Sequence, residues 1–209
     1  MADRSLAMVD GDEERLKALL DTRLEADADR KSIDQRIWDL FGEHWAIMIT
    51  DLSGYSRQVE AYGITHFMQS IYESHKLFCP IVEDHDGWLL QDYADNLLIL
   101  FRKPQKALSC AIALQHASEA YNADRAELDH IVVCIGIGVG EVLRIGPYKI
   151  FGQQVNAASK LGEDTATGGE ILVTGAFRDA IADAKNVAFH AIEDFPHSAE
   201  AAYRIAYRI

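Results

Sequence analysis

The sequence predicts an α+β protein with elements in the order β-α-β-β-α-β, followed by further strands and helices. Two observations carry this prediction. Short apolar runs suited to buried strands alternate with longer segments in which apolar residues recur at helical spacing. In addition, a short polar turn joins two of the strands, which is typical of a β-hairpin. The 209 residues, 49% of them apolar, suffice for one sizeable core.

Residues 1–44 are expected to form a helical extension that precedes a domain of residues 45–209. From residue 12 to residue 41 the chain is charged, lacks glycine and proline, and repeats leucine and isoleucine at helical spacing. An acidic stretch at 25–29 interrupts the apolar stripe, so one or two amphipathic helices are expected, with Gly42 as a suitable end. A solvated arm would show the same pattern, but the stripe favours packing on the domain or on a partner subunit.

Within the domain, each element follows from local sequence. Proline is expected in the first turn of one helix, and a break at 63–65 interrupts another. Glycines 136, 138 and 140 alternate along a strand, which suggests close approach to a ligand, to a neighbouring strand or to another subunit. The expected strands are 45–50, 88–91, 97–101, 130–140, 141–145, 170–174, 187–191 and 202–207, and the expected helices are 58–82, 104–122, 152–161 and 176–182.

Composition excludes several classes of protein. The net charge of -13 argues against a duplex nucleic-acid partner, because such binding relies on basic groups that neutralise phosphates. The three cysteines are widely spaced among apolar neighbours, which indicates buried reduced thiols rather than disulfides or a zinc site. No apolar run reaches the roughly 20 residues of a membrane span, and the first residues lack a signal-peptide apolar region. We therefore expect a cytoplasmic protein.

Two acidic residues at strand ends give the best functional clue. Asp51 follows the strand at 45–50, and Asp95 comes just before the strand at 97–101. Carboxylates so placed could hold a pair of hard divalent cations, while the small-residue turn at 52–56 leaves backbone N–H groups to face an anion. Strand-end aspartates are also common for turn and capping reasons alone. The surrounding pattern favours a site for metal and phosphate.

Four stretches, in order, resemble the catalytic domain of class III adenylate and guanylate cyclases: residues 50–56 (TDLSGYS), 94–96 (ADN), 135–142 (IGIGVGEV) and 151–161 (FGQQVNAASKL). The likeness covers about residues 45 to 205. It implies a ferredoxin-like βαββαβ core that forms head-to-tail homodimers, with nucleotide sites built from both subunits. It also implies conversion of a nucleoside triphosphate to a 3′,5′-cyclic nucleotide, a signalling molecule, and pyrophosphate, with two Mg²⁺ or Mn²⁺ ions per site.

The resemblance assigns roles by position. Asp51 and Asp95 match the metal-binding aspartates, and the backbone of Leu52 matches a contact to metal and phosphate. The turn that follows is expected to bind substrate through Ser53, Gly54 and Tyr55.

Asn156 also matches the family, at the residue that orients the ribose, but other positions depart from the family pattern. Lys160 stands where the family has an arginine, which keeps the charge and loses the planar fork. At the two base-reading positions, Gln91 replaces lysine and Lys149 replaces aspartate, so the base stays open between adenine, guanine and a pyrimidine. The family's phosphate-binding lysine near the last strands has no counterpart around residues 193–195.

Three functions compete on this evidence. The leading one is a homodimeric, metal-dependent nucleotidyl cyclase, favoured by the two aspartates and Asn156. The second is a cyclase-like domain that has lost turnover and serves as a nucleotide-binding or dimerising regulatory module. The third, a nucleic-acid binder, is disfavoured by the acidic composition. Residues 1–44 contain no recognisable sensor motif, so control through subunit association or a separate regulatory protein is expected.

Overall fold

The computed structural model describes residues 2–207, with side chains described except at 2–10 and 55–58. The chain forms two compact units. The smaller unit combines Met1–His44 with Glu141–Gly152, and the larger unit combines Trp45–Gly140 with Gln153–Ile209. Strands β1 (Gly42–Leu52) and β4 (Val133–Ile145) each run from one unit into the other.

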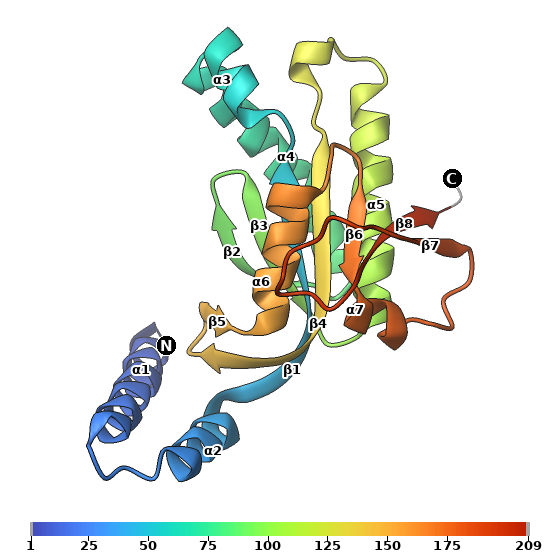
Figure 1. Ribbon diagram of the computed structural model, residues 1–209. Coiled ribbons are helices and arrows are strands. Elements are labelled where there is room, and N and C mark those ends of the chain that lie inside the picture. Colours follow the sequence, from blue (N-terminus) through green and yellow to red (C-terminus); the bar gives the residue numbers. More distant parts are fainter. Residues whose placement is uncertain (1, 208–209) are drawn as a thin grey trace. The chain divides into compact units, whose positions relative to one another are not determined.

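The sheet has the predicted ferredoxin-like arrangement. Its first four strands lie in the order β2-β3-β1-β4, so that the hairpin of β2 (Trp88–Tyr93) and β3 (Asn96–Phe101) flanks β1. Beyond β4 the sheet continues through the additional C-terminal strands (Figure 1). These are β6 (Ile171–Thr174), β8 (Ala202–Tyr207) and β7 (Val187–Ala191). The α+β fold class expected from the sequence is therefore confirmed.

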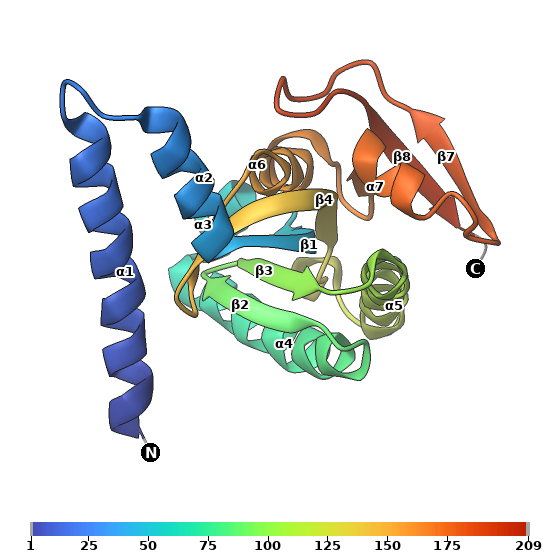
Figure 2. The ribbon, with the colours of Figure 1, turned by 90° about the horizontal axis from the view of Figure 1, so that it is seen from below.

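Helices cover both faces of this sheet. Figure 2 shows α4 (Ile64–Asp84) and α5 (Pro104–Asn122) on one face, with α6 (Gln153–Lys160) on the other. The core lies under α4 and α5, where Phe78 and Leu114 pack with residues of the central strands. The remaining helical elements are α3 (Tyr55–Tyr62), α7 (Gly175–Ala180), the 3₁₀ turn η1 (Glu127–Asp129) and the π-helical turn η2 (Leu161–Thr165).

Strand β4 shows why its glycines alternate. Ile135 and Ile137 are buried in the core, while Gly136 and Gly138 point to the opposite face because side chains alternate along a strand. A Cβ atom at Gly136 would lie 2.0 Å from the carbonyl oxygen of Ala158 in α6. The close approach is thus made by a helix of the same chain, and the expectation of a ligand, strand or other subunit there is corrected.

The same contact explains a wrong boundary. Residues 130–140 and 141–145 were expected as two strands, because the glycines resemble turn punctuation. The structure has one strand, β4, since the missing side chains make room for α6 without interrupting the backbone hydrogen bonds. The short strand β5 (Lys149–Phe151), which pairs with the end of β4, was not expected at all.

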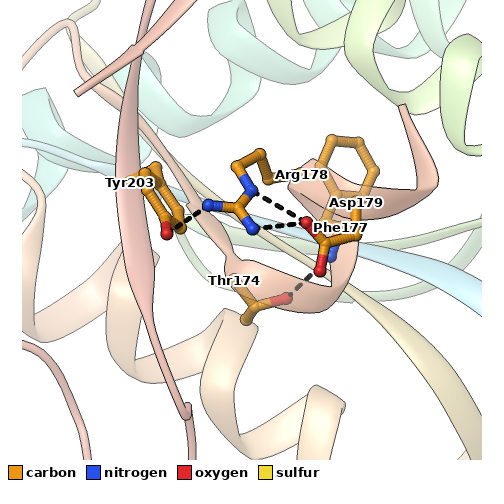
Figure 3. A network of polar contacts seen from close by, with 5 residues as sticks. All are labelled: Thr174, Phe177, Arg178, Asp179 and Tyr203. Atoms are coloured by element: carbon orange, nitrogen blue, oxygen red, sulfur yellow. Dashed lines mark hydrogen bonds and ion pairs between the residues drawn. The ribbon is translucent and has the colours of Figure 1, made fainter. Parts of the chain in front are cut away.

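A polar network attaches α7 to β8 in the larger unit (Figure 3). The guanidinium of Arg178 lies over the ring of Tyr203, 4.4 Å from its centroid, and donates hydrogen bonds to the Tyr203 hydroxyl and to Asp179. Thr174 caps the helix by accepting the backbone N–H of Phe177 at 3.3 Å. These contacts hold the C-terminal strands beside the core sheet.

The smaller unit contains two helices, as the pattern of its apolar residues indicated. They are α1 (Ala2–Leu24) and α2 (Arg30–Phe41), and α2 ends at Gly42 as expected. Ile37, Phe41 and Ile145 form a buried cluster against which Leu16 of α1 packs. The helices are thus anchored on the end of β4, whereas a boundary between residues 44 and 45 stays a prediction.

The cysteines agree with the expectation of free thiols. All three are unpaired, with Cys110 and Cys134 buried and Cys79 half-buried. Burial raises the pKa of the Cys110 thiol to about 12, so this group stays protonated and behaves as a small apolar side chain. Over residues 2–207, no helix is long and apolar enough to cross a membrane.

Candidate active site

Strand pairing brings the two predicted metal ligands to one edge of the sheet. In the antiparallel register of β1 and β3, Thr50 lies opposite Leu97, and the Leu97 N–H donates to the Thr50 hydroxyl at 3.3 Å. The next residue of β1, Asp51, therefore faces the hairpin tip that carries Asp95. At this tip Ala94 has a φ of 55°, a left-handed conformation that costs a non-glycine residue about 1 kcal/mol.

The pKa of Asp51 reflects its burial and the acidic groups around it. Burial, together with the negative charges of Asp95, Glu163 and Asp164, raises the pKa of Asp51 to about 7, against the opposing hydrogen bond from the Leu52 N–H. Burial also raises the pKa of Asp95. Without a cation, Asp51 therefore titrates near neutral pH, and a bound divalent cation would compete with the proton.

The turn after Asp51 differs from expectation. The N–H of Ser53 donates to the carbonyl of Val132 at 2.8 Å, and the N–H of Leu52 is bonded to the Asp51 carboxylate, so neither is free for an anion. Gly54, with a φ of 93°, precedes α3 and has no side chain to cap it. The first amides of α3 are thus the donors that an anion would meet. Tyr55 begins this helix, and its predicted side-chain role lies outside the described residues.

Helix α6 carries the predicted ribose and phosphate residues on one exposed face. Asn156 and Lys160 are four residues apart, so their side chains project from the same side. Lys160 lines a cavity of about 490 Å³ together with Arg204 of β8 and Asp194 of the loop that precedes this strand. Arg204 pairs with Glu170 at 2.5 Å. Arg204 is thus a second cation in the cavity that Lys160 lines, although the sequence around residues 193–195 has no lysine.

One acidic residue near the site was missed by sequence reasoning. The carboxylate of Glu163 in η2 accepts a hydrogen bond from the Ser159 hydroxyl at 2.5 Å and another from the Asn96 side chain at 2.7 Å. The four-residue spacing of Ser159 and Glu163 was a visible signal for the first contact. Nothing in the sequence indicated the second, which joins residues 67 positions apart.

The two predicted base-reading residues lie in different units. Gln91 is exposed on β2, beside a register shift between Leu89 and Gln91 in the pairing with β3. Lys149 is on β5 and forms an ion pair with Glu13 of α1 at 2.7 Å, which lowers the pKa of the Glu13 carboxyl. The structure thus finds Lys149 already engaged by an acidic partner.

The donor set fits a hard divalent ion. In the described part of the chain, no group of three or more His, Cys, Asp or Glu side chains is arranged to hold a metal. Two carboxylates alone suit Mg²⁺ or Mn²⁺, because such ions are commonly bound through one or two carboxylates, substrate phosphates and water. Asp51 and Asp95 would hold the ions, with the remaining ligands supplied by the bound nucleotide.

Comparison with known proteins agrees with this geometry. No family model matches the chain. The chain is 28% identical over 134 residues to the serine/threonine-protein kinase pkn2 of Myxococcus xanthus, and 28% identical over 146 residues to adenylate cyclase 1 of Rhizobium meliloti. These matches cover 64% and 62% of this chain. They span only 16% and 22% of the two relatives, so the chain corresponds to a small part of each.

Solved structures show the same fold. An adenylate/guanylate cyclase/hydrolase from Silicibacter pomeroyi superposes with a TM-score of 0.68 at 23% identity, over 79% of this chain and 96% of that one. The guanylyl cyclase Cya2 gives a TM-score of 0.65 at 20% identity, over 78% of this chain and 90% of that one. The fold is therefore that of adenylate and guanylate cyclase domains, as the resemblance noted in the sequence implied.

Proposed function

We propose that the chain is a metal-dependent nucleotidyl cyclase, which converts a nucleoside triphosphate to a 3′,5′-cyclic nucleotide and pyrophosphate at a homodimer interface. The observation that carries this proposal is the pair Asp51 and Asp95, brought together from residues 44 positions apart in sequence at one sheet edge. Most of the similar proteins described above are cyclases, which supports the same class.

The residues of the site suit this chemistry. In the reaction, the 3′ oxygen of the ribose forms a bond to the α-phosphorus, and the bond from that phosphorus to the oxygen bridging to the β-phosphate breaks. Two divalent ions, when bound, would lower the pKa of the 3′ hydroxyl and neutralise phosphate charge. Asp51 and Asp95 would hold these ions, and Asn156 would orient the ribose.

Phosphate charge needs cations from the chain as well. Lys160 contributes a point charge in place of the family's arginine, and the guanidinium of Arg204 lines the same cavity. Three carboxylates, Asp164, Glu170 and Asp194, line this cavity too. Because these acids oppose phosphate binding, we expect weak affinity for a free triphosphate and a strong dependence on the metal ions.

A homodimer accounts for the exposure of the site residues. Gln91, Asn156 and Lys160 all lie exposed in the single chain, whereas a nucleotide site normally encloses most of its ligand. A second copy would cover this surface. The cytoplasmic location and a separate regulatory protein remain predictions.

The test is incubation of the purified chain with each of the four ribonucleoside triphosphates and Mn²⁺, followed by chromatography of cyclic products. We expect one preferred base and no product from Asp51→Asn or Asp95→Asn. Lys160→Arg is expected to raise kcat several-fold, because the planar fork can bind two phosphate oxygens at once. Absence of cyclic product from all four triphosphates at high enzyme concentration would reject the cyclase.

A second candidate is a domain that binds nucleotide or dimerises without turnover. It is favoured by Lys160 at the arginine position and by the ion pair that engages Lys149. Calorimetric binding of a triphosphate with Mn²⁺, in a protein that yields no cyclic product, would establish this function.

A further inference from the structure

We infer that Glu163 is a positioning residue, which ties helix α6 to the tip of the β2–β3 hairpin and so sets the placement of Lys160 relative to Asp51 and Asp95. This inference rests on the proposed function, because it concerns the same site. Three observations carry it: the two hydrogen bonds of the carboxylate, the π-helical turn that presents it, and the glycine contact beneath that turn.

Each oxygen of the carboxylate has its own partner. Oε1 accepts from Nδ2 of Asn96 at 2.7 Å, and Oε2 accepts from the hydroxyl of Ser159 at 2.5 Å. Asn96 follows Asp95 directly in the chain, and Ser159 precedes Lys160 directly. A single side chain therefore connects the neighbour of a predicted metal ligand to the neighbour of the predicted phosphate cation.

The backbone places Glu163 for this task. Residues Leu161–Thr165 form a π-helical turn at the end of α6, and such turns are frequent at functional sites because the extra residue redirects the side chains around it. The turn closes with the Ala166 N–H donating to the Leu161 carbonyl at 2.8 Å. An uninterrupted α-helix would point residue 163 in a different direction.

The turn is seated firmly on the sheet. A Cβ atom at Gly162 would lie 2.9 Å from the nitrogen of Gly136 in β4 and 2.9 Å from the carbonyl oxygen of Ile49 in β1. The packing of Gly162 on the sheet thus fixes how closely η2 approaches β1 and β4, while the hydrogen bond from Asn96 to Glu163 fixes where η2 lies relative to the hairpin. The side-chain oxygen of Asn96 is buried without a hydrogen-bond partner among the described residues. Its amide group therefore depends on Glu163 for orientation.

Glu163 also adds negative charge near Asp51, so charge and positioning have to be separated by experiment. Asp164 offers the matched control, because it is exposed, adjacent in sequence, and likewise raises the pKa of Asp51. No hydrogen bond of its side chain occurs among the described residues. Asp164→Asn removes one charge without the connection, Glu163→Ala removes both, and Glu163→Gln removes the charge while keeping one acceptor oxygen.

The experiment measures cyclic nucleotide formation with the preferred triphosphate and Mn²⁺, together with hydrogen exchange of the amides of residues 94–97. For Glu163→Ala we expect kcat to fall ten- to hundredfold with KM within threefold, because misplacement of a charged group acts mainly on the transition state. Exchange at 94–97 should become at least tenfold faster. Glu163→Gln should recover a large part of both properties. Asp164→Asn should leave exchange at 94–97 within threefold of the wild type, so that any change in its activity measures the effect of charge alone.

The outcomes separate the two claims. If the wild type makes cyclic nucleotide but Glu163→Ala and Asp164→Asn lose the same activity and show unchanged exchange, Glu163 acts through charge and the positioning inference is overturned. If the wild type makes no product while exchange at 94–97 rises in Glu163→Ala alone, the cyclase proposal fails and the connection between α6 and the hairpin stands. Unchanged exchange in an inactive protein overturns both.

Discussion

Replacing Asp51 by asparagine should stabilise the metal-free protein at alkaline pH, although it removes a ligand needed for function. The folded protein raises the pKa of this carboxyl from 3.8 to about 7, chiefly through burial and then through Asp95. Because the folded state holds this proton more tightly than the unfolded state, the contribution of Asp51 to folding stability is fully present only below the unfolded pKa of 3.8. That stability is lost as pH rises through about 7, where the buried carboxyl ionises.

The size of the effect follows from the shift. About three pKa units at about 1.4 kcal/mol each give a ceiling of about 4 kcal/mol. The carboxyl is only half-buried, so solvent screening reduces this to about 2 kcal/mol. For a chain of this length, such a change corresponds to a rise in Tm of roughly 4 to 8 °C. Asparagine has nearly the same shape and carries no charge, so packing should change little.

Thermal unfolding in EDTA, followed by circular dichroism at pH 8 and at pH 4.5, measures this difference. We expect Asp51→Asn to be the more stable protein at pH 8 and the gap to shrink at pH 4.5, because the wild-type carboxyl is then mostly protonated. Carboxyl groups remote from Asp51 titrate alike in both proteins and cancel in the comparison. A variant that is less stable than the wild type at pH 8 would refute the account of Asp51 as a buried, repelled carboxylate.

Three further outcomes are expected. Calorimetric affinity for Mn²⁺ should fall at least tenfold between pH 8 and pH 5.5, because protons compete for Asp51 with its pKa of about 7; a flat profile would exclude Asp51 as a ligand. Gly136→Ala should lower the free energy of unfolding in urea by about 2 kcal/mol or more, since its Cβ would lie 2.0 Å from the Ala158 oxygen. Gly11→Ala, with open space around it, should raise the free energy of unfolding by roughly 0.5 to 1 kcal/mol. Equal effects would contradict the close packing of α6. Glu13→Gln should lower KM for the preferred triphosphate two- to fivefold if Lys149 contacts the base, and an unchanged KM would show that Lys149 acts elsewhere.

Sequence reasoning succeeded where local patterns decide the structure. The helix Pro104–Asn122 and the strands Val187–Ala191 and Ala202–Tyr207 have the bounds expected, because proline, turn residues and apolar periodicity mark their ends. The fold class followed from the order of these elements. Residues at the site were found only through their likeness to a family, since strand-end aspartates alone are ambiguous.

Errors arose where distant segments meet. The glycines of β4 predict a strand boundary that the structure does not have. They are needed because α6, roughly twenty residues further along the chain, packs against them. The N–H of Ser53 was expected to face an anion, but Val132 accepts it. Glu163 escaped notice because its partner Asn96 is remote in sequence. Local sequence patterns do not predict contacts between residues that are distant in the sequence.

By itself, the sequence determined most of the segments that form strands and helices, the α+β fold class, and which aspartates are candidates for metal binding, since all three depend on residue type and spacing. Only the tertiary structure decided three points: that Asp95 lies close enough to Asp51 to raise the pKa of Asp51, that α6 packs directly against the glycines of β4, and that Glu163 joins η2 at the end of that helix to the hairpin. The physical reason is that charge interaction, steric exclusion and hydrogen bonding depend on distance in space. Strand pairing and helix packing set those distances between residues that the chain itself keeps far apart.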